Sequence, residues 1–182
     1  MQLTIVVRTS AVDDLPEINR IRLHPLVRPH QFGFLRDHDR IWKQWIEQNA
    51  RVGDMWFRSS TIIGNERIIG YVNQTLYFAG QSQFAECGWN LDPDYWGRGI
   101  MKTALRMVLQ RLFIEQNMSR VVADCFRDNT RCKRLLSKLH FSQYAVPMVE
   151  RVRMAYQFRC LHWIERYSID RGTWDRTRPS PK

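Results

Sequence analysis

The chain has 182 residues, of which 44% are hydrophobic and 25% are charged. This length and this balance are typical of one globular domain with a substantial core, and no stretch is long and apolar enough to span a membrane. The formal net charge is +10 at pH 7. Such a charge favours acidic partners such as nucleic acid, ribosomal surfaces or phosphorylated cofactors, and a basic face that is merely solvated is the alternative.

The amino-terminal residues and the cysteines indicate a reduced, cytoplasmic setting. Residues 1–8 lack a basic leader, and their apolar run ends well short of a secretion signal. Cys87, Cys125, Cys132 and Cys160 have neither C-x-x-C nor metal-ligand spacing. We therefore expect reduced thiols and no metal site.

The first half of the chain predicts a strand, two helices and a meander. Residues 4–8 alternate weakly, as in a strand, and residues 11–18 carry an Asp cap and an early Pro that begin a helix ending near residue 22. Residues 23–39 predict a loop, and residues 39–49 predict a second helix in which Trp42 and Trp45 pack in the core, with a place in the lining of a substrate pocket as the alternative. Residues 56–63, 66–78 and 84–91 predict three antiparallel strands with turns at 64–65 and 80–81.

The second half predicts alternating helices and strands. Apolar side chains recur at helical spacing from residue 99 to residue 113. Residues 121–126 then predict a strand, 129–139 a helix, and 141–158 with 161–169 a closing pair of long strands. This order predicts a mixed α/β sheet in a single domain over residues 1–170. Residues 171–182 are rich in Arg, Pro and Ser and predict a poorly ordered tail, in which Trp174 is the exception.

One segment indicates a ligand. Residues 90–101 read Asn-Leu-Asp-Pro-Asp-Tyr-Trp-Gly-Arg-Gly-Ile-Met and lead from a predicted strand, through a turn with two glycines, into the periodic helix. Glycines let the backbone approach a ligand, and the first amides of a helix have no intrahelical partners. The segment therefore predicts a cradle for a phosphorylated cofactor. The alternative is a Gly-x-Gly turn that serves only an unusual backbone angle.

This segment resembles the coenzyme A loop of the GNAT superfamily of N-acetyltransferases, and its Tyr-Trp-Gly-Arg-Gly-Ile-Met form resembles the RimJ/RimL branch of ribosomal-protein N-terminal acetyltransferases. Residues 85–91 and 121–125 resemble the fourth and fifth strands of that branch, and residues 129–141 resemble its Asn-x-x-Ser … Lys-Leu-Gly-Phe segment. Cys132 takes the usual serine position and His140 the usual glycine position. The resemblance implies a mixed, mostly antiparallel central sheet flanked by helices.

The resemblance implies acetyl-CoA as the cofactor. The amides from Gly97 to Lys102 would hold the pyrophosphate, and Arg98 would add charge. Asn129 would hold the pantetheine amides and Arg134 a phosphate, unless Arg134 is only a solvated helix charge. The expected cofactor-binding residues are Asn90, Leu91, Asp92, Trp96, Gly97, Arg98, Gly99, Ile100, Met101, Lys102, Asn129 and Arg134.

Acetyl transfer to an amine needs a base, a donor to the carbonyl and an acid. We expect Glu86 to be the base, directly or through water, unless it is a surface or salt-bridged carboxylate. An amide of Asn90 or Leu91 would polarise the carbonyl. Cys132 would protonate the leaving thiolate or be acylated in a ping-pong route, although a small residue at a tight helix start is the alternative. Tyr144 is the second candidate acid.

The resemblance implies an N-acetyltransferase that acts by direct attack in a ternary complex, with a protein N-terminus as the preferred acceptor. A small amine or antibiotic, aminoacyl-tRNA, and a non-catalytic module that binds nucleic acid or a regulatory partner are the alternatives. His24, His30 and His38 lack metal-ligand spacing and are interpreted as loop or recognition residues. The resemblance also suggests an acidic or ribosomal partner surface, a homodimer and no membrane association.

Overall fold

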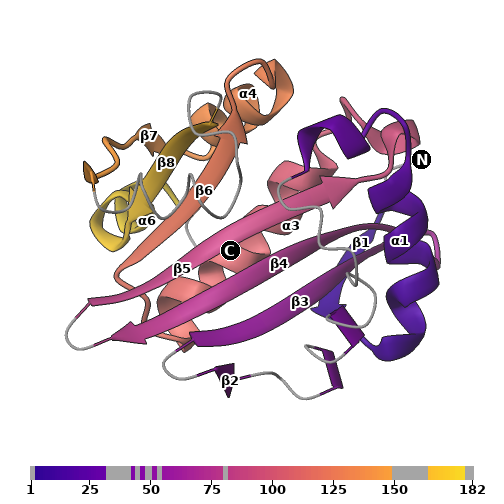
Figure 1. Ribbon diagram of the computed structural model, residues 1–182, viewed down its shortest axis with the longest axis horizontal. Helices are drawn as coiled ribbons and strands as arrows, with labels where there is room; N and C mark the ends of the chain where they lie inside the picture. Colours follow the sequence, from indigo (N-terminus) through magenta and orange to yellow (C-terminus); the bar gives the residue numbers. More distant parts are fainter. Residues whose placement is uncertain are drawn as a thin grey trace.

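The computed structural model describes residues 3–31, 42–43, 46–47, 51–52, 55–79, 82–148 and 164–178. The described strands form one eight-stranded sheet in the order β1-β3-β4-β5-β6-β8-β7, with β2 paired to β3 (Figure 1). Every described strand pair is antiparallel except β5 with β6, which is parallel. The expectation of a mixed, mostly antiparallel sheet is confirmed.

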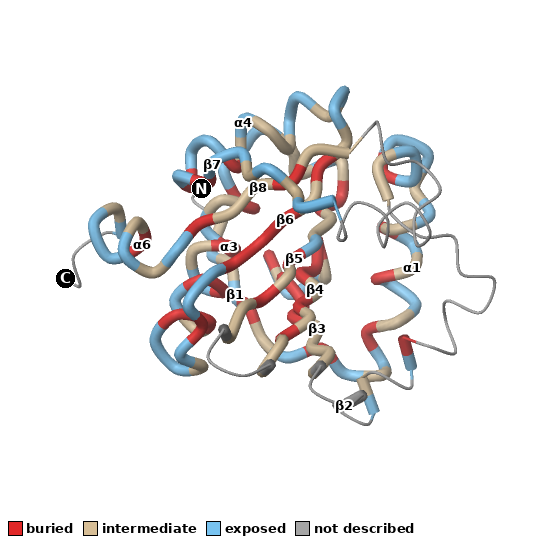
Figure 2. The backbone as a smooth tube through the Cα atoms, turned by 60° about the vertical axis from the view of Figure 1, so that its left-hand side comes forward, coloured by how far each residue is buried: buried red, intermediate tan, exposed pale blue. Residues whose placement is uncertain are grey.

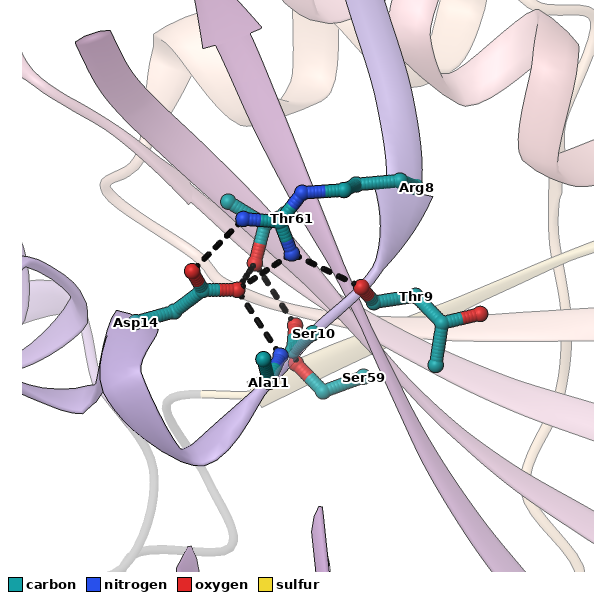
Figure 3. Close-up of polar contacts among 7 residues, drawn as sticks. All are labelled: Arg8, Thr9, Ser10, Ala11, Asp14, Ser59 and Thr61. Atoms are coloured by element: carbon teal, nitrogen blue, oxygen red, sulfur yellow. Dashed lines mark hydrogen bonds and ion pairs between the residues drawn. The ribbon is translucent and has the colours of Figure 1, made fainter.

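The amino-terminal elements are tied together by a buried carboxylate. They are β1 (Ile5–Thr9), the 3-10 turn η1 (Val12–Asp14), α1 (Leu15–Leu23) and the 3-10 turn η2 (Arg28–His30). Asp14 accepts hydrogen bonds from Arg8 Nη1 and Nη2, each at 2.7 Å, from Thr61 Oγ1 at 2.8 Å and from the Ala11 amide at 2.9 Å (Figure 3). These contacts tie the residue before α1 to β1 and β3, although the Asp14 side chain makes no capping hydrogen bond to α1 itself.

The predicted meander is confirmed. It consists of β3 (Met55–Gly64), β4 (Arg67–Ala79) and β5 (Ser82–Leu91), and the short strand β2 (Arg51–Val52), which was not predicted, pairs with β3. The first turn falls at residues 65–66, where Asn65 and Glu66 have positive φ. The turn expected at 80–81 and Trp45 lie outside the described residues. Of the helix expected over 39–49, the structure describes residues 42–43 and 46–47, which are helical.

The periodic helix is confirmed as α3 (Ile100–Gln110), which continues in a wider π turn (Arg111–Glu115). Its apolar stripe packs on the sheet. The next elements are β6 (Arg120–Phe126) and α4 (Thr130–Lys138), as expected. In Figure 2, β6 runs through the middle of the molecule as a mostly buried strand, with α3 on one side of the sheet and α1 on the other.

Two expectations at the carboxyl end are wrong. Among the described residues 141–148 the strand is limited to β7 (Ser142–Gln143), which pairs with β8 (Ile164–Asp170), and residue 148 is helical, so the expected unbroken strand from 141 is interrupted; residues 149–163 lie outside the described part. Instead of beginning a poorly ordered tail, residues 171–177 form α6 (Arg171–Thr177). Asp170 caps it by accepting from the Thr173 amide at 2.7 Å, and Trp174 stacks on Phe113 with ring centres 5.8 Å apart.

Side chains of β5 alternate between the two faces of the sheet. Ala85, Cys87 and Leu91 point into the core that contains α3, and we call this side the α3 face. Asn90 points the other way, because its Nδ2 donates to Tyr71 Oη at 2.7 Å and Tyr71 packs in the cluster with α1 residues. We call that side the α1 face. The same alternation puts Glu86 on the α1 face.

Candidate active site

Strands β5 and β6 form a fork. They pair only where residues 84–86 of β5 meet residues 120–122 of β6, while β5 continues to Leu91 against β4. In Figure 1 the two strands are adjacent at one end and diverge toward the other. A fork of this kind leaves one edge of β5 without a partner among the described strands over residues 87–91, and main-chain groups there can bind an extended ligand.

Two hydrogen bonds show which amides of β5 face the fork. The Asp92 amide donates to Ile69 O on the β4 side at 2.8 Å, and Gln83 O accepts from the Ser119 amide on the β6 side at 2.8 Å. Because main-chain groups alternate between the two edges of a strand, even-numbered residues of β5 face β4 and odd-numbered residues face the fork. The Leu91 amide therefore faces the fork, whereas the Asn90 amide faces β4.

The turn after β5 has the geometry of an anion cradle. After the 3-10 turn η3 (Pro93–Tyr95), Gly97 and Gly99 adopt φ of 77° and 74°, and α3 begins at the next residue. A Cβ at either glycine would meet nothing within 4 Å, so the left-handed backbone and not crowding favours glycine here. The first amides of α3 thus open onto space beside the fork.

Some side chains of the cradle are buried or hydrogen-bonded within the protein, and others are exposed. Asp92 is buried and binds inward, to the Asp94 amide at 3.1 Å and to Arg20 at 2.8 Å. Trp96 Nε1 donates to Leu91 O at 2.8 Å. Ile100 and Met101 are buried, which leaves their main chain for a ligand. The exposed Arg98 and the half-buried Lys102 supply positive charge.

The start of α4 meets the cradle. The Arg131 guanidinium lies 4.2 Å from the centre of the Trp96 ring. Asn129 caps α4, because its Oδ1 accepts from the Cys132 amide at 3.1 Å. Arg134 lies exposed on the same helix. His140 ends the segment with a φ of 62°, the left-handed backbone that favours glycine, which is the usual residue at this position in the resemblance.

Cys132 lies half-buried on the α3 face and forms a pair with Cys125 of β6. The hydrogen bond between the two thiols, together with burial, raises the pKa of Cys132. Cys125 Sγ is also 3.3 Å from Phe126 O. A thiol of raised pKa stays protonated at neutral pH, which makes it a weak nucleophile.

Glu86 belongs to a cluster of buried charges on the α1 face. Arg166 of β8 forms two hydrogen bonds with Asp124 of β6, each at 2.7 Å, and its Nη2 lies 3.5 Å from Glu86 Oε1. Tyr77 Oη donates to Glu86 Oε2 at 3.2 Å. Burial and the Asp124 charge raise the pKa of Glu86, while Arg166 and Tyr77 oppose the rise. Its pKa is therefore closer to that of a base working at neutral pH.

Tyr144 and Cys132, the two candidate acids, lie on opposite faces. The Tyr144 amide donates to Arg166 O at 2.8 Å, so Tyr144 extends the ladder between β7 and β8 and shares the α1 face with Arg166. The Arg120 guanidinium lies 5.6 Å from its ring centre. The structure thus brings Cys132 together with the cradle and puts Tyr144 at the edge of the sheet.

Asp124, Arg166 and Tyr77 were missed by the sequence reasoning. Asp124 had a signal, since it is the one carboxylate inside the otherwise apolar predicted strand 121–125, and buried charges in strands are usually paired. Arg166 stands in the predicted strand 161–169 next to another charged residue, Glu165, and had a weaker signal. Nothing in the sequence indicated that Tyr77 contacts Glu86.

A hollow opens beside this cluster. It has a volume of about 40 Å³, is open to solvent, and has Thr75 in its wall, directly opposite Glu86 in the β4–β5 register. A space of this size holds a few water molecules or one small chemical group. The described residues that line the hollow are Trp42, Ile46, Phe57, Arg58, Ser59, Asn73, Gln74 and Thr75.

Two further classes of site are absent from the described part of the chain. Its His, Cys, Asp and Glu residues nowhere gather in threes that could hold a metal ion. None of its helices combines the length and the apolarity that a membrane crossing requires.

Sequence relatives are acetyltransferases. The chain is 29% identical over 92 residues to the uncharacterized N-acetyltransferase YnaD of Bacillus subtilis, covering 50% of this chain and 53% of that one. It is 32% identical over 82 residues to the probable N-acetyltransferase YjcK of the same organism, covering 45% of each. The chain therefore spans about half the length of the curated relatives it matches.

Solved structures share the fold. The ribosomal-protein-S5-alanine acetyltransferase of Vibrio fischeri aligns with a TM-score of 0.70 and 19% identity, over 98% of this chain and all of that one. Mycobacterium smegmatis RimJ in complex with CoA-disulfide gives 0.70 and 20%, over 92% and 82% of the chains. A variant of the spermidine N-acetyltransferase SpeG from Vibrio cholerae gives 0.68 and 15%, over 93% and 95%.

The family model of the acetyltransferase (GNAT) domain matches residues 4–142, which contain the fork, the cradle and the start of α4. At the level of the family, the match agrees with the resemblance noted in the sequence. The chain belongs to the GNAT acetyltransferase family, whose members use acetyl-CoA.

Proposed function

We propose that the protein transfers an acetyl group from acetyl-CoA to a primary amine, with the α-amino group of a protein N-terminus as the preferred acceptor. The carrying observation is the position of Glu86: a half-buried carboxylate of raised pKa on the α1 face, directly opposite Thr75 of the hollow's wall, on the strand whose other edge borders the fork. The family supports the transfer. The S5-alanine acetyltransferase and RimJ support a protein acceptor, while SpeG shows that this fold also serves a polyamine.

The residues present fit acetyl-CoA, which when bound supplies the acetyl thioester. The cradle has two left-handed glycines in open space and the unpartnered amides of a helix start, the donor set that suits a pyrophosphate. In our proposal the amides of residues 97–102 hold the pyrophosphate, Arg98 and Arg134 add charge, and Asn129 uses its amide nitrogen while its oxygen caps α4. The Leu91 amide, and not that of Asn90, donates to the thioester carbonyl.

Glu86 takes the proton of the acceptor amine, directly or through one water. An α-amino group has a pKa near ~8, so a carboxylate of raised pKa is a competent base for it. Arg166 and Asp124 hold Glu86 in place from the side of β6, and Tyr77 holds it from β4. The base therefore has a fixed orientation before the amine arrives, which is the condition for efficient proton transfer.

Cys132 assists the departing thiolate as a hydrogen-bond donor. It lies at the start of α4, which contacts the cradle through Arg131 and Trp96. Its raised pKa makes it a weak acid and leaves little nucleophilic thiolate at neutral pH, which disfavours acylation and so supports direct attack rather than a ping-pong route. Tyr144 is the second candidate, and its place at the sheet edge makes it the weaker one.

A thiol-release assay tests the proposal. Acetyl-CoA is offered with peptides of varied N-termini, small amines and aminoacyl-tRNA, and cofactor binding is followed by calorimetry. Turnover on peptides supports the proposal, and Glu86→Gln should reduce it by roughly 10²–10⁴ with cofactor affinity kept. Binding of nucleic acid that weakens with salt, with no turnover on any acceptor, would instead support a non-catalytic module.

A further inference from the structure

The hollow beside Glu86 presents side chains without formal charge. Phe57, Asn73 and Thr75 point to the α1 face, in register with one another and with Glu86. Arg58 and Gln74 have the opposite orientation: the Arg58 guanidinium lies 5.7 Å from the Trp56 ring centre, and Gln74 Nε2 donates to Ser60 Oγ at 2.9 Å. These two residues therefore line the hollow through their main chain.

The wall of the hollow is preorganised. The Trp42 ring packs edge-on against Tyr71 with centres 5.2 Å apart, and Tyr71 is almost fully buried with its hydroxyl held by Asn90. Ser59 Oγ accepts from Ser10 Oγ at 2.9 Å. A rigid aromatic wall with an amide and a hydroxyl, Asn73 and Thr75, suits a group that combines apolar surface with one or two hydrogen bonds.

A second cation on the acceptor would have no described counter-charge in this hollow. An ammonium group that enters it loses hydration without gaining a carboxylate partner, which is costly in a partly buried site. The described lining of the hollow contains no carboxylate. Glu86, opposite Thr75, is engaged by the reacting amine in the proposed function, and Asp14 is engaged by Arg8. The net charge of +10 adds a long-range repulsion for polycations.

Building on the proposed function, we infer that this hollow selects acceptors whose group next to the reacting amine is uncharged, and that it discriminates against polyamines and against N-termini that begin with a cationic residue. The selecting side chains are Trp42, Phe57, Asn73 and Thr75. They act as specificity determinants and take no part in proton transfer.

The test compares two peptides that differ only in their first residue, norleucine or lysine, whose side chains are similar in length. We expect kcat/KM to be roughly tenfold or more higher for the norleucine peptide, and spermidine to be a poorer acceptor than either. Calorimetric binding of norleucinamide and lysinamide to the Glu86→Gln variant loaded with acetyl-CoA should give the same order, which adds a readout independent of turnover.

Asn73→Asp places a carboxylate in the hollow and should reduce or reverse this preference, with cofactor affinity unchanged. Asn65→Asp makes the same chemical change at an exposed turn and should leave the preference as it is. Thr75→Asp is the second variant if Asn73→Asp does not fold. Turnover without discrimination, or with a preference for the lysine peptide or spermidine, overturns the inference and leaves the proposed function standing. No turnover on any acceptor overturns both.

Discussion

Arg166 and Glu86 meet at the long end of the hydrogen-bond range, with 3.5 Å between Nη2 and Oε1. The guanidinium is already held by Asp124 through two contacts of 2.7 Å, so Arg166 compensates the charge of Glu86 only in part. This division is the physical reason that burial and Asp124 together prevail and the pKa of Glu86 is raised.

Removing Arg166 should raise the pKa of Glu86 further. In Arg166→Met the one cation that opposes the rise is lost, so the acidic limb of the kcat–pH profile should move to higher pH, and activity at pH 6 should fall more than activity at pH 8.5. Profiles are measured with acetyl-CoA and amine saturating. Arg166→Lys keeps the charge and should shift the limb less. An unchanged limb in Arg166→Met would show that Glu86 is not the titrating base.

Ionisation of Glu86 should lower the unfolding free energy as the pH rises. Because its pKa is raised on folding, the folded state binds more protons than the unfolded state between the ordinary Glu value of about 4.3 and the raised value. Stability is therefore lost as pH rises through that window. Glu86→Gln should lose less unfolding free energy than the wild type between pH 4 and pH 8, measured by urea denaturation. The exposed Glu115→Gln serves as the control, and equal pH dependence in all three proteins would contradict the expectation.

Substitution of Cys132 separates its possible roles. If the thiol only donates a proton, Cys132→Ser should retain turnover or improve it, because a hydroxyl is the better hydrogen-bond donor. Cys132→Ala should lower kcat by roughly tenfold or more. Initial-velocity patterns should intersect in the wild type. Parallel patterns, with loss of activity in Cys132→Ser, would instead indicate an acyl-enzyme.

Gly99→Ala should weaken cofactor binding. A side chain at φ 74° costs about 1–2 kcal/mol in backbone strain, and relief of that strain would turn the first amides of α3 away from the ligand. Calorimetry with coenzyme A measures the affinity, and thermal unfolding measures the stability. Gly88→Ala adds the same methyl group in open space on β5, and its cofactor affinity should match the wild type. Equal affinity for Gly99→Ala would remove the cradle from the proposal.

Asp14→Ala should destabilise the fold. Burial alone would raise the pKa of Asp14, but its hydrogen bonds with Arg8, Ala11 and Thr61 together lower it. The stabilisation is thus present above the unfolded value of about 3.9 and is lost as the pH falls through the folded value. We expect a loss of about 1–3 kcal/mol at pH 7 that shrinks below pH 4.

Chemical denaturation of Asp14→Ala over this pH range measures the loss. The exposed neighbour Asp13→Ala should remain close to the wild type at each pH. A deficit that does not change with pH would show that packing, and not the charge of Asp14, accounts for its contribution.

The sequence pattern predicted those elements that depend mainly on interactions between residues close together in the chain. The apolar stripe from residue 101 to residue 113 gave α3, and the glycines at 97 and 99 gave its start. By contrast, α6 was missed because its composition is that of a loop, and it is stabilised by the cap at Asp170 and by Trp174, which packs against a distant helical turn. Contacts over such a separation leave no local pattern.

The candidate site was also predictable only in its local parts. The turn with its two left-handed glycines could be predicted, because main-chain geometry follows from glycine placement. The pairing of Asp124 with Arg166 joins positions 42 residues apart, and it depends on β8 lying beside β6, which the sequence order does not reveal. The choice between the Asn90 and Leu91 amides likewise required the hydrogen-bond register of β5 with β4.

In the proposed function, strand β5 serves two ligands through a single periodicity. Glu86 and Asn90 lie on the α1 face while the odd-numbered amides face the fork, so one parity would set the position of the base and the other that of the carbonyl donor. Inserting one residue within the paired part of β5 before Glu86 would exchange the two sets, turning the carboxylate toward the core and the fork-facing amides toward β4. An insertion within the paired part of this strand that keeps such a site intact must therefore add residues in pairs.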